Sequence, residues 1–123
     1  MKVKSYRDLY NATYEDYQQG EIVMLRVPIA NPNGVTQGIH PGVIISNDMA
    51  NKCAPCVTVA LITSKVKRLD MCSHMEVLLE KSSMVMMEQT VTISKEDILE
   101  RVAILNRAKM QELKRCMKLF FAL

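Results

Sequence analysis

Residues 56–64, CVTVALITS, are the most strand-like stretch of the chain. They are apolar or β-branched almost throughout, and a loop containing Pro55 precedes them. A short apolar run bounded by turn residues is typical of a strand buried within a sheet. The stretch therefore predicts a domain built on a β-sheet.

Further strands are predicted on both sides of this stretch. A long loop rich in Asn, Pro and Gly is expected over residues 30–40, and a polar turn or single helical turn over residues 47–55. A charged connection is expected over residues 65–73. The segments with strand-like texture are residues 21–29, 41–46, 74–80, 84–89 and 90–93.

Residues 94–123 carry helical signals instead. Ser94 and Asp97 form an S-x-x-D capping pattern, which predicts a short helix with an apolar inner side. In residues 106–123, apolar side chains recur at steps of three and four, as in an amphipathic helix packed on a sheet. Strands followed by helices predict an α+β fold, a small and mostly antiparallel β-barrel with a C-terminal amphipathic helix. The inward-facing residues are expected to be Ile98, Leu99 and Val102 in the first helix and Met110, Leu113, Met117 and Phe120 in the second.

The first 19 residues are polar and differ from the rest of the chain. Tyr6, Tyr10, Tyr14 and Tyr17 recur at helical spacing, which fits a short helix that packs on a partner surface. An extended arm fits the same residues. We therefore expect an N-terminal extension over residues 1–19, helix or arm, and a barrel domain over residues 20–123.

The composition is that of a globular protein of one domain. Hydrophobic residues make up 49% of the 123 residues and charged residues 24%. No apolar run is long enough to span a bilayer, and the N-terminus shows no secretory signal. Four cysteines without an export signal are expected to be reduced thiols, so we expect a cytoplasmic protein. A net charge of +3 is compatible with nucleic-acid binding but does not identify it.

Two short motifs allow a metal site. Cys53 and Cys56 have C-x-x-C spacing, and Cys72 with His74 forms C-x-H, so the four together offer zinc ligands. C-x-H spacing is unusual, however, and Cys56 leads into a predicted buried strand where a small apolar thiol fits. We therefore expect no metal and no other cofactor.

A basic run follows the best strand. In residues 64–68, SKVKR, the cations are Lys65, Lys67 and Arg68. Such a run is commonly a solvated surface, but it binds phosphates when it lies beside a groove. Which applies here depends on what lies next to the run.

Five segments, taken in chain order, resemble one known family. They are GEIVML (20–25), QGIHPGVIISND (37–48), ANKCAPCVTVALITSKVKR (50–68), HMEVLL (74–79) and SMVMMEQTVTISKEDILERVAIL (83–105), followed by the terminal helix. In this order they resemble the MazF/PemK (Kid) family, the toxin halves of bacterial toxin–antitoxin pairs. The resemblance runs from about Gly20 to Leu123.

The resemblance implies a fold and an activity. Members have an SH3-like barrel with a C-terminal helix and form homodimers. They cleave single-stranded RNA, including mRNA, without a metal: a 2′-OH attacks the neighbouring phosphorus and leaves a cyclic phosphate and a 5′-OH. An antitoxin segment occupies the RNA groove, and the dimer helps the antitoxin to bind operator DNA. No membrane association is implied.

The resemblance also assigns site residues. The family Thr at the end of the central strand matches Thr63, while the family Arg before Pro is replaced by His40. Glu88 matches an acidic residue implicated in some members, and Val91 replaces a second family cation. The expected catalytic residues are thus His40, Thr63 and Glu88. The expected RNA-binding residues are Gln37, Ser64, Lys65, Lys67, Arg68 and Gln89. Val35 stands where many members carry an acidic loop residue.

The replacement at His40 leaves three interpretations open. Imidazole is a common proton shuttle, so His40 can be the catalytic acid or base of a changed mechanism. It can be a weak substitute for the always-charged Arg, or a loop residue in a protein that no longer cleaves RNA. Loss of a fixed cation costs about 10²–10³ in rate. The competing hypothesis is therefore a non-catalytic module that binds an antitoxin peptide or nucleic acid.

Overall fold

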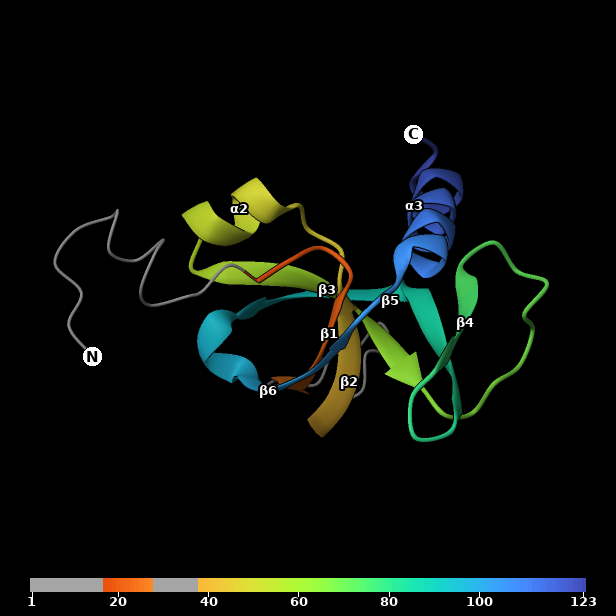
Figure 1. Cartoon of the computed structure of the whole chain (residues 1–123), viewed down its shortest axis with the longest axis horizontal. Helices are drawn as coiled ribbons and strands as arrows, with labels where there is room; N and C mark the ends of the chain where they lie inside the picture. The colour runs from red at the N-terminus through yellow and green to blue at the C-terminus, as the bar shows by residue number, and fades with distance from the viewer. Residues whose placement is uncertain (1–16, 28–37) are drawn as a thin grey trace, which may run out of the picture.

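The computed structural model describes residues 17–27 and 38–123. Six strands form one antiparallel sheet in the order β4-β5-β3-β2-β1-β6, which curls as a half-barrel (Figure 1). The helix α3 lies beside β4 and β5 at one end (Figure 1). The elements are β1 (Glu21–Val27), β2 (Gly38–Ile44), α2 (Asp48–Cys53), β3 (Cys56–Thr63), β4 (His74–Leu78), β5 (Ser82–Ser94), η2 (Lys95–Asp97), β6 (Ile98–Ile104) and α3 (Arg107–Phe121).

The strand β3 is buried on both faces, as its apolar run predicts. Val57, Val59 and Leu61 belong to one core cluster, inside the curl of the sheet. Ala60 and Ile62 belong to a second cluster, which includes residues of α3. A strand covered on both sides has no polar face, and this explains why residues 56–63 lack the alternation of a half-exposed strand.

The predicted C-terminal helix is confirmed. Asn106 caps it by accepting a hydrogen bond from the Lys109 N–H at 2.9 Å. Leu113 and Cys116 are buried against the second cluster, and Met110 and Met117 pack on the same cluster. The apolar face ends earlier than expected, since Phe120 is 39% exposed.

The predicted helix with Ile98, Leu99 and Val102 on its inner side is wrong. Ser94 does cap a turn, accepting a hydrogen bond from the Glu96 N–H at 3.2 Å, but the turn is only the 3₁₀ segment η2. The chain then extends as β6 and pairs with the free edge of β1. Leu99 and Val102 are consequently exposed. The two short strands expected over residues 84–93 are one strand, β5.

The start of β2 also differs from the prediction. His40 lies within the strand and pairs opposite Leu25 of β1, whereas a loop was expected up to residue 40. Pairing between β2 and β3 begins only at Gly42, so among the described residues Pro41 is paired with Met24 of β1 and with no residue of β3. Proline has no N–H to donate, and it is tolerated where one side of a strand is free of a partner.

The predicted N-terminal extension falls largely outside the described residues. Its last residues pack on the domain: the Gln19 backbone N–H donates to Asp48 Oδ1 at 2.8 Å, and its side-chain amide donates to the Ile45 carbonyl at 2.7 Å. Gln37 and Val35 also lie outside the described residues. Among the described helices, none has the length and apolar character needed to cross a membrane.

Candidate active site

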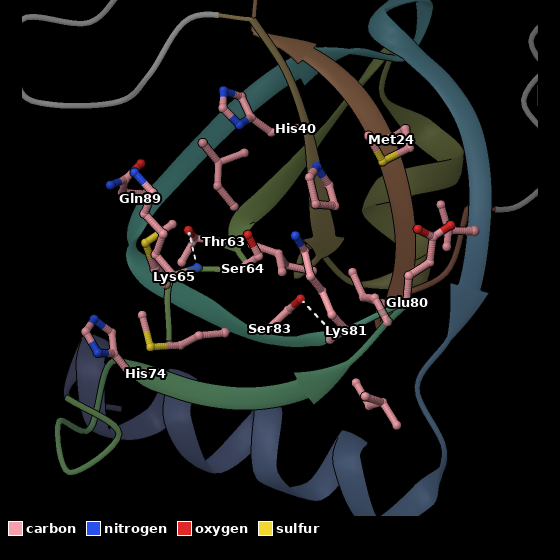
Figure 2. A pocket seen from close by; sticks show the side chains of 18 of the residues that line it. Met24, His40, Thr63, Ser64, Lys65, His74, Glu80, Lys81, Ser83 and Gln89 are labelled. Carbon is pink, nitrogen blue, oxygen red and sulfur yellow. Dashed lines mark hydrogen bonds between the residues drawn. The ribbon is translucent and has the colours of Figure 1, made fainter. Parts of the chain in front are cut away.

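A cleft of about 1270 Å³ opens on the curled sheet, and all six strands contribute to its lining (Figure 2). Its apolar wall includes Met24, Leu61 and Met84. Its polar wall gathers most of the residues that the sequence singles out. These are His40, Thr63, Ser64, Lys65, Lys67, Glu88 and Gln89, with His74, Glu80 and Lys81 in addition.

The pairing of β2 and β3 brings His40 and Thr63 to the same cleft. Gly42 is paired with Leu61, and this is the last pair of the ladder. Beyond this pair, within the described residues, the two strands are no longer paired. His40 and Thr63 each lie two residues past it, and both line the cleft.

His40 has a ring nitrogen without a partner. Within the described part of the chain, its Nε2 atom is buried and makes no hydrogen bond. A buried polar atom without a hydrogen bond costs free energy, so this nitrogen favours a ligand that brings a donor or acceptor. Gly38 stands next to the ring with a φ of +121°, a backbone conformation open mainly to glycine.

The hydroxyl of Thr63 is oriented by the loop that follows it. Its Oγ1 atom accepts a hydrogen bond from the Lys65 backbone N–H at 3.1 Å. Since an accepting hydroxyl keeps its own proton, Thr63 remains able to donate to a ligand in the cleft. The Lys65 and Lys67 side chains are exposed and line the same cleft.

Arg68, the third cation of the basic run, does not line the cleft. Its guanidinium binds Asp70 with two hydrogen bonds, Nε–Oδ1 at 3.0 Å and Nη2–Oδ2 at 3.1 Å. The hydrogen bond with Arg68 lowers the pKa of the Asp70 carboxyl, and the same hydrogen bond raises the pKa of Arg68. Lys65 and Lys67 of this loop therefore line the cleft, whereas Arg68 binds Asp70 within the loop.

A bulge in β5 presents Glu88 and Gln89. Ala60 pairs with Thr90, but the next residue, Leu61, pairs with Met86, so residues 87–89 stand outside the ladder. The Thr90 hydroxyl donates to the Met87 carbonyl at 2.6 Å and closes the bulge. β-Bulges next to active sites often change the direction of a side chain. The sequence signal is the run of three polar residues at 88–90, where two short strands, residues 84–89 and 90–93, were expected to meet.

His74 is a site residue whose role the sequence did not predict. Its Nε2 atom lies 2.7 Å from Oε2 of Glu88, and its Nδ1 atom lies 2.9 Å from the Arg68 carbonyl and 3.2 Å from that of Lys67. Burial acts to lower the pKa of His74, but the hydrogen bonds to Glu88 and Arg68 outweigh it and raise the pKa above its ordinary 6.5. Burial likewise acts to raise the pKa of Glu88, and the bond to His74 reverses this, so the pKa lies below 4.5.

Val91, at the position of the second family cation, is not among the residues that line the cleft. It packs on the core cluster that contains Val57, Val59 and Leu61. Lys81, between β4 and β5, lies at another part of the cleft wall (Figure 2). Among the described residues, the cations of the cleft are thus Lys65, Lys67 and Lys81.

The residues considered for zinc do not form one cluster. Within residues 17–27 and 38–123, no three His, Cys, Asp or Glu side chains are placed to hold a metal ion. Cys53 ends α2, whereas Cys72 lies by α3, where its carbonyl accepts a hydrogen bond from the Cys116 thiol. Both ring nitrogens of His74 are engaged by oxygen atoms.

Comparison with known proteins relates this chain to a family. Residues 18–121 match the family model of the PemK-like, MazF-like toxin of type II toxin–antitoxin systems. An endoribonuclease MazF of Staphylococcus saprophyticus is 38% identical over 80 residues, which cover 61% of this chain and 67% of the relative.

Solved structures share the fold. The crystal structure of MazF (Form-I) from Deinococcus radiodurans has a TM-score of 0.72 at 15% identity, covering 89% of this chain and 99% of that one. A mycobacterial endoribonuclease in complex with its cognate antitoxin has a TM-score of 0.68 at 14% identity, covering 88% and 95%. These similarities confirm the predicted α+β barrel with its C-terminal helix.

Proposed function

Because the chain belongs to the family of PemK-like, MazF-like toxins of type II toxin–antitoxin systems, we propose that it is an endoribonuclease. Its substrate in this proposal is single-stranded RNA, mRNA in particular, cleaved without a metal ion. The observation that carries the proposal is that His40 and Thr63, each just beyond the end of the β2–β3 pairing, line one cleft. The place of action is then the cytoplasm, where mRNA is found.

The proposed reaction is a transphosphorylation. The ribose 2′ oxygen forms a bond to the adjacent phosphorus, the bond from phosphorus to the 5′ oxygen breaks, and the products are a 2′,3′-cyclic phosphate and a 5′-OH. The step needs an acceptor for the 2′ proton, a donor for the leaving oxygen and a stabiliser of the phosphorane charge.

His40 is the proposed proton acceptor. A neutral imidazole has one unprotonated nitrogen, and His40 lines the cleft in which it is proposed to take the 2′ proton. The same nitrogen, once protonated, can return a proton to the 5′ oxygen. General acid–base catalysis of this kind contributes about 10²–10⁴ in rate.

Thr63 and the lysines are proposed to stabilise the charge on the phosphorane. The Thr63 hydroxyl donates to a non-bridging oxygen, while Lys65 and Lys67 bind phosphates along the strand. Ser64 and Gln89 line the same path. Glu88 is proposed to support the site through His74, because its carboxylate already accepts a hydrogen bond from that ring.

An antitoxin is the proposed regulator. The family description names a toxin–antitoxin system, and the antitoxin-bound mycobacterial structure has the same fold. We propose that an antitoxin segment occupies the cleft and excludes RNA, and that the toxin acts as a homodimer that helps the antitoxin to bind operator DNA. Exposed apolar side chains on β6, including Leu99, Val102 and Ile104, support a protein interface there.

The test is cleavage of mixed single-stranded RNA by purified protein in excess EDTA. The proposal expects fragments that end in a cyclic phosphate and begin with a 5′-OH. Activity that EDTA abolishes, or fragments that begin with a 5′ phosphate, would contradict the proposed reaction.

A non-catalytic binding module is the second candidate. It is favoured by the two positions where the family has cations and this chain has His40 and Val91. This alternative expects the protein to bind an antitoxin peptide or RNA while leaving RNA intact. Growth arrest on expression that persists in the Thr63→Ala variant would support it against the nuclease.

A further inference from the structure

The ring of His74 faces oxygen atoms on both sides. Nε2 meets Oε2 of Glu88 at 2.7 Å, and Nδ1 meets the carbonyls of Arg68 at 2.9 Å and Lys67 at 3.2 Å. A neutral imidazole has one N–H and one lone pair, so it would set a lone pair against one of these oxygens. An imidazolium has two N–H groups and satisfies both sides. The surroundings of His74 therefore select its protonated form.

These contacts join two parts of the cleft wall. Nδ1 binds the basic loop, defined here as residues 64–70, through the backbone of Lys67 and Arg68. Nε2 binds the β5 bulge through Glu88. The side chain of His74 is only 6% exposed, so it fills the space between loop and bulge.

The backbone of the basic loop contains an unfavourable conformation that contacts with its surroundings can stabilise. Arg68 has a φ of +53°, a left-handed conformation that is unfavourable for a residue with a side chain. The Arg68 carbonyl accepts hydrogen bonds from His74 Nδ1 and from the Met71 N–H at 3.1 Å. Two donors thus hold the Arg68 carbonyl, and one of them, His74 Nδ1, also lies 3.2 Å from the carbonyl of Lys67.

We propose that the protonated ring of His74 is a positioning residue of the ribonuclease, fastening the basic loop to the Glu88 bulge so that Lys65 and Lys67 meet RNA phosphates. The ring does not touch the scissile phosphate. Loss of its proton loosens the loop and weakens RNA binding. This role rests on the proposed function, since it presumes that the cleft binds RNA.

The charged groups around His74 define a pH window. Glu88 faces it from β5, and Asp70 and Arg68 are paired with each other in the loop. From α3, the Cys116 thiol donates to the carbonyl of Cys72, two residues before His74. Burial raises the pKa of the Cys116 thiol to about 11, so Cys116 stays neutral in this range.

The pH dependence of this fastening follows from the directions in which the pKa values of His74 and Glu88 are shifted. The pKa of His74 is raised, so its contribution is complete below pH 6.5 and is lost as pH rises through the raised value. The pKa of Glu88 is lowered, so its contribution is complete above pH 4.5 and is lost as pH falls through the lowered value. The fastening is therefore strongest between about pH 4.5 and 6.5.

The first test observes the ring itself. ¹⁵N NMR of the wild-type protein at pH 6 is expected to show both nitrogens of His74 protonated, and this state is expected to persist above pH 6.5. A single protonated nitrogen at pH 6 would overturn the proposal. This measurement needs neither RNA nor a variant.

The second test measures binding of a 2′-O-methylated single-stranded RNA, which lacks the nucleophile and is not cleaved. At pH 6, His74→Gln is expected to weaken binding about 10-fold and to flatten its salt dependence by a slope of up to about 1.4, since each phosphate contact on a single strand contributes about 0.7. At pH 9 the two proteins should converge. The matched control Lys114→Gln removes one positive charge from α3, away from the cleft, and should follow the wild type.

The outcomes separate the two proposals. Equal affinity and equal salt slope of wild type and His74→Gln at pH 6 would overturn the role of His74 and leave the nuclease intact. A wild-type protein that binds no RNA would overturn both. Cleavage by the wild type with unchanged kcat but higher KM in His74→Gln would support positioning, because the loop binds substrate and His40 carries out the chemistry.

Discussion

His40 on β2 and Thr63 on β3 line the same cleft, each two residues beyond the last pair of the β2–β3 ladder, Gly42 with Leu61. The pairing of β2 and β3 therefore ends next to the two residues that are proposed to carry out the chemistry. One strand supplies an imidazole with an unpartnered nitrogen, and the other supplies a hydroxyl oriented by the loop behind it. The cleft that both side chains line has a volume of about 1270 Å³.

Removing the Thr63 hydroxyl should slow cleavage without unfolding the protein. Thr63→Val keeps the shape of the side chain but loses the donor to the phosphorane, so we expect the cleavage rate to fall about 10²–10³-fold. Thr63→Ser should retain most of the rate. The control is Thr58→Val, which makes the same change on the same strand, where Thr58 bonds to Thr92 outside the cleft. Equal rates for Thr63→Val and Thr58→Val would contradict the assigned role.

The His40→Arg variant distinguishes two roles of His40, that of a proton acceptor and that of a substitute for a cation. A guanidinium is always charged and cannot accept a proton, whereas the proposal makes His40 a proton acceptor. We therefore expect His40→Arg to cleave RNA at least about 10²-fold more slowly than the wild type. Multiple-turnover rates between pH 6 and 9 provide the measurement. A variant as fast as the wild type would show that His40 only substitutes for a cation.

The bond between His74 and Glu88 should make stability depend on pH. Because the raised pKa of His74 places its contribution below that pKa, Glu88→Gln should lower the free energy of unfolding at pH 6 and have little effect at pH 9. The expected loss is about 1 kcal/mol, since Glu88 is 39% exposed and solvent screens the pair. Denaturant unfolding at both pH values gives the comparison, with exposed Glu96→Gln as the matched change. A loss that is the same at both pH values would argue against an imidazolium.

Docking of α3 should depend on Leu113. This residue is fully buried between the helix and the sheet. Leu113→Ala should cost about 2–5 kcal/mol, the range for large-to-small changes in a packed core. Leu119→Ala on the exposed part of the same helix is the control and should cost far less. Similar losses for both variants in thermal or denaturant unfolding would mean that the helix is not docked as described.

The sequence predicts the elements whose pattern is local. The apolar run of β3 and the stepwise apolar face of α3 are visible in the chain itself, and both are confirmed. The order of family motifs also brings His40 and Thr63 into one hypothesis, and the two do share a cleft. Their roles in catalysis stay predictions.

The strand β6 shows where local pattern is not enough. Residues 98–104, ILERVAI, contain good helix formers after a capping serine, and the same serine equally begins a 3₁₀ turn. The deciding factor is remote: β1 has a second edge, and pairing with it satisfies the backbone groups of both strands. Sequence pattern does not contain this contact.

His74 shows the same limit at the site. Its C-x-H spacing with Cys72 allows a metal ligand. Only the fold shows that its two nitrogens contact oxygen atoms of the basic loop and of the β5 bulge. Glu88 reaches it because the β5 ladder skips residues 87–89, an irregularity that depends on pairing with β3.

The central claim is that one imidazole and one hydroxyl act on the same phosphodiester. Single-turnover cleavage of single-stranded RNA in EDTA, by the wild type, His40→Ala, Thr63→Val and the double variant, tests it most directly. We predict that each single change slows cleavage at least about 100-fold and that the double variant is little slower than the slower single variant, since groups acting as a unit are not additive. A His40→Ala protein that cleaves at the wild-type rate would contradict the claim.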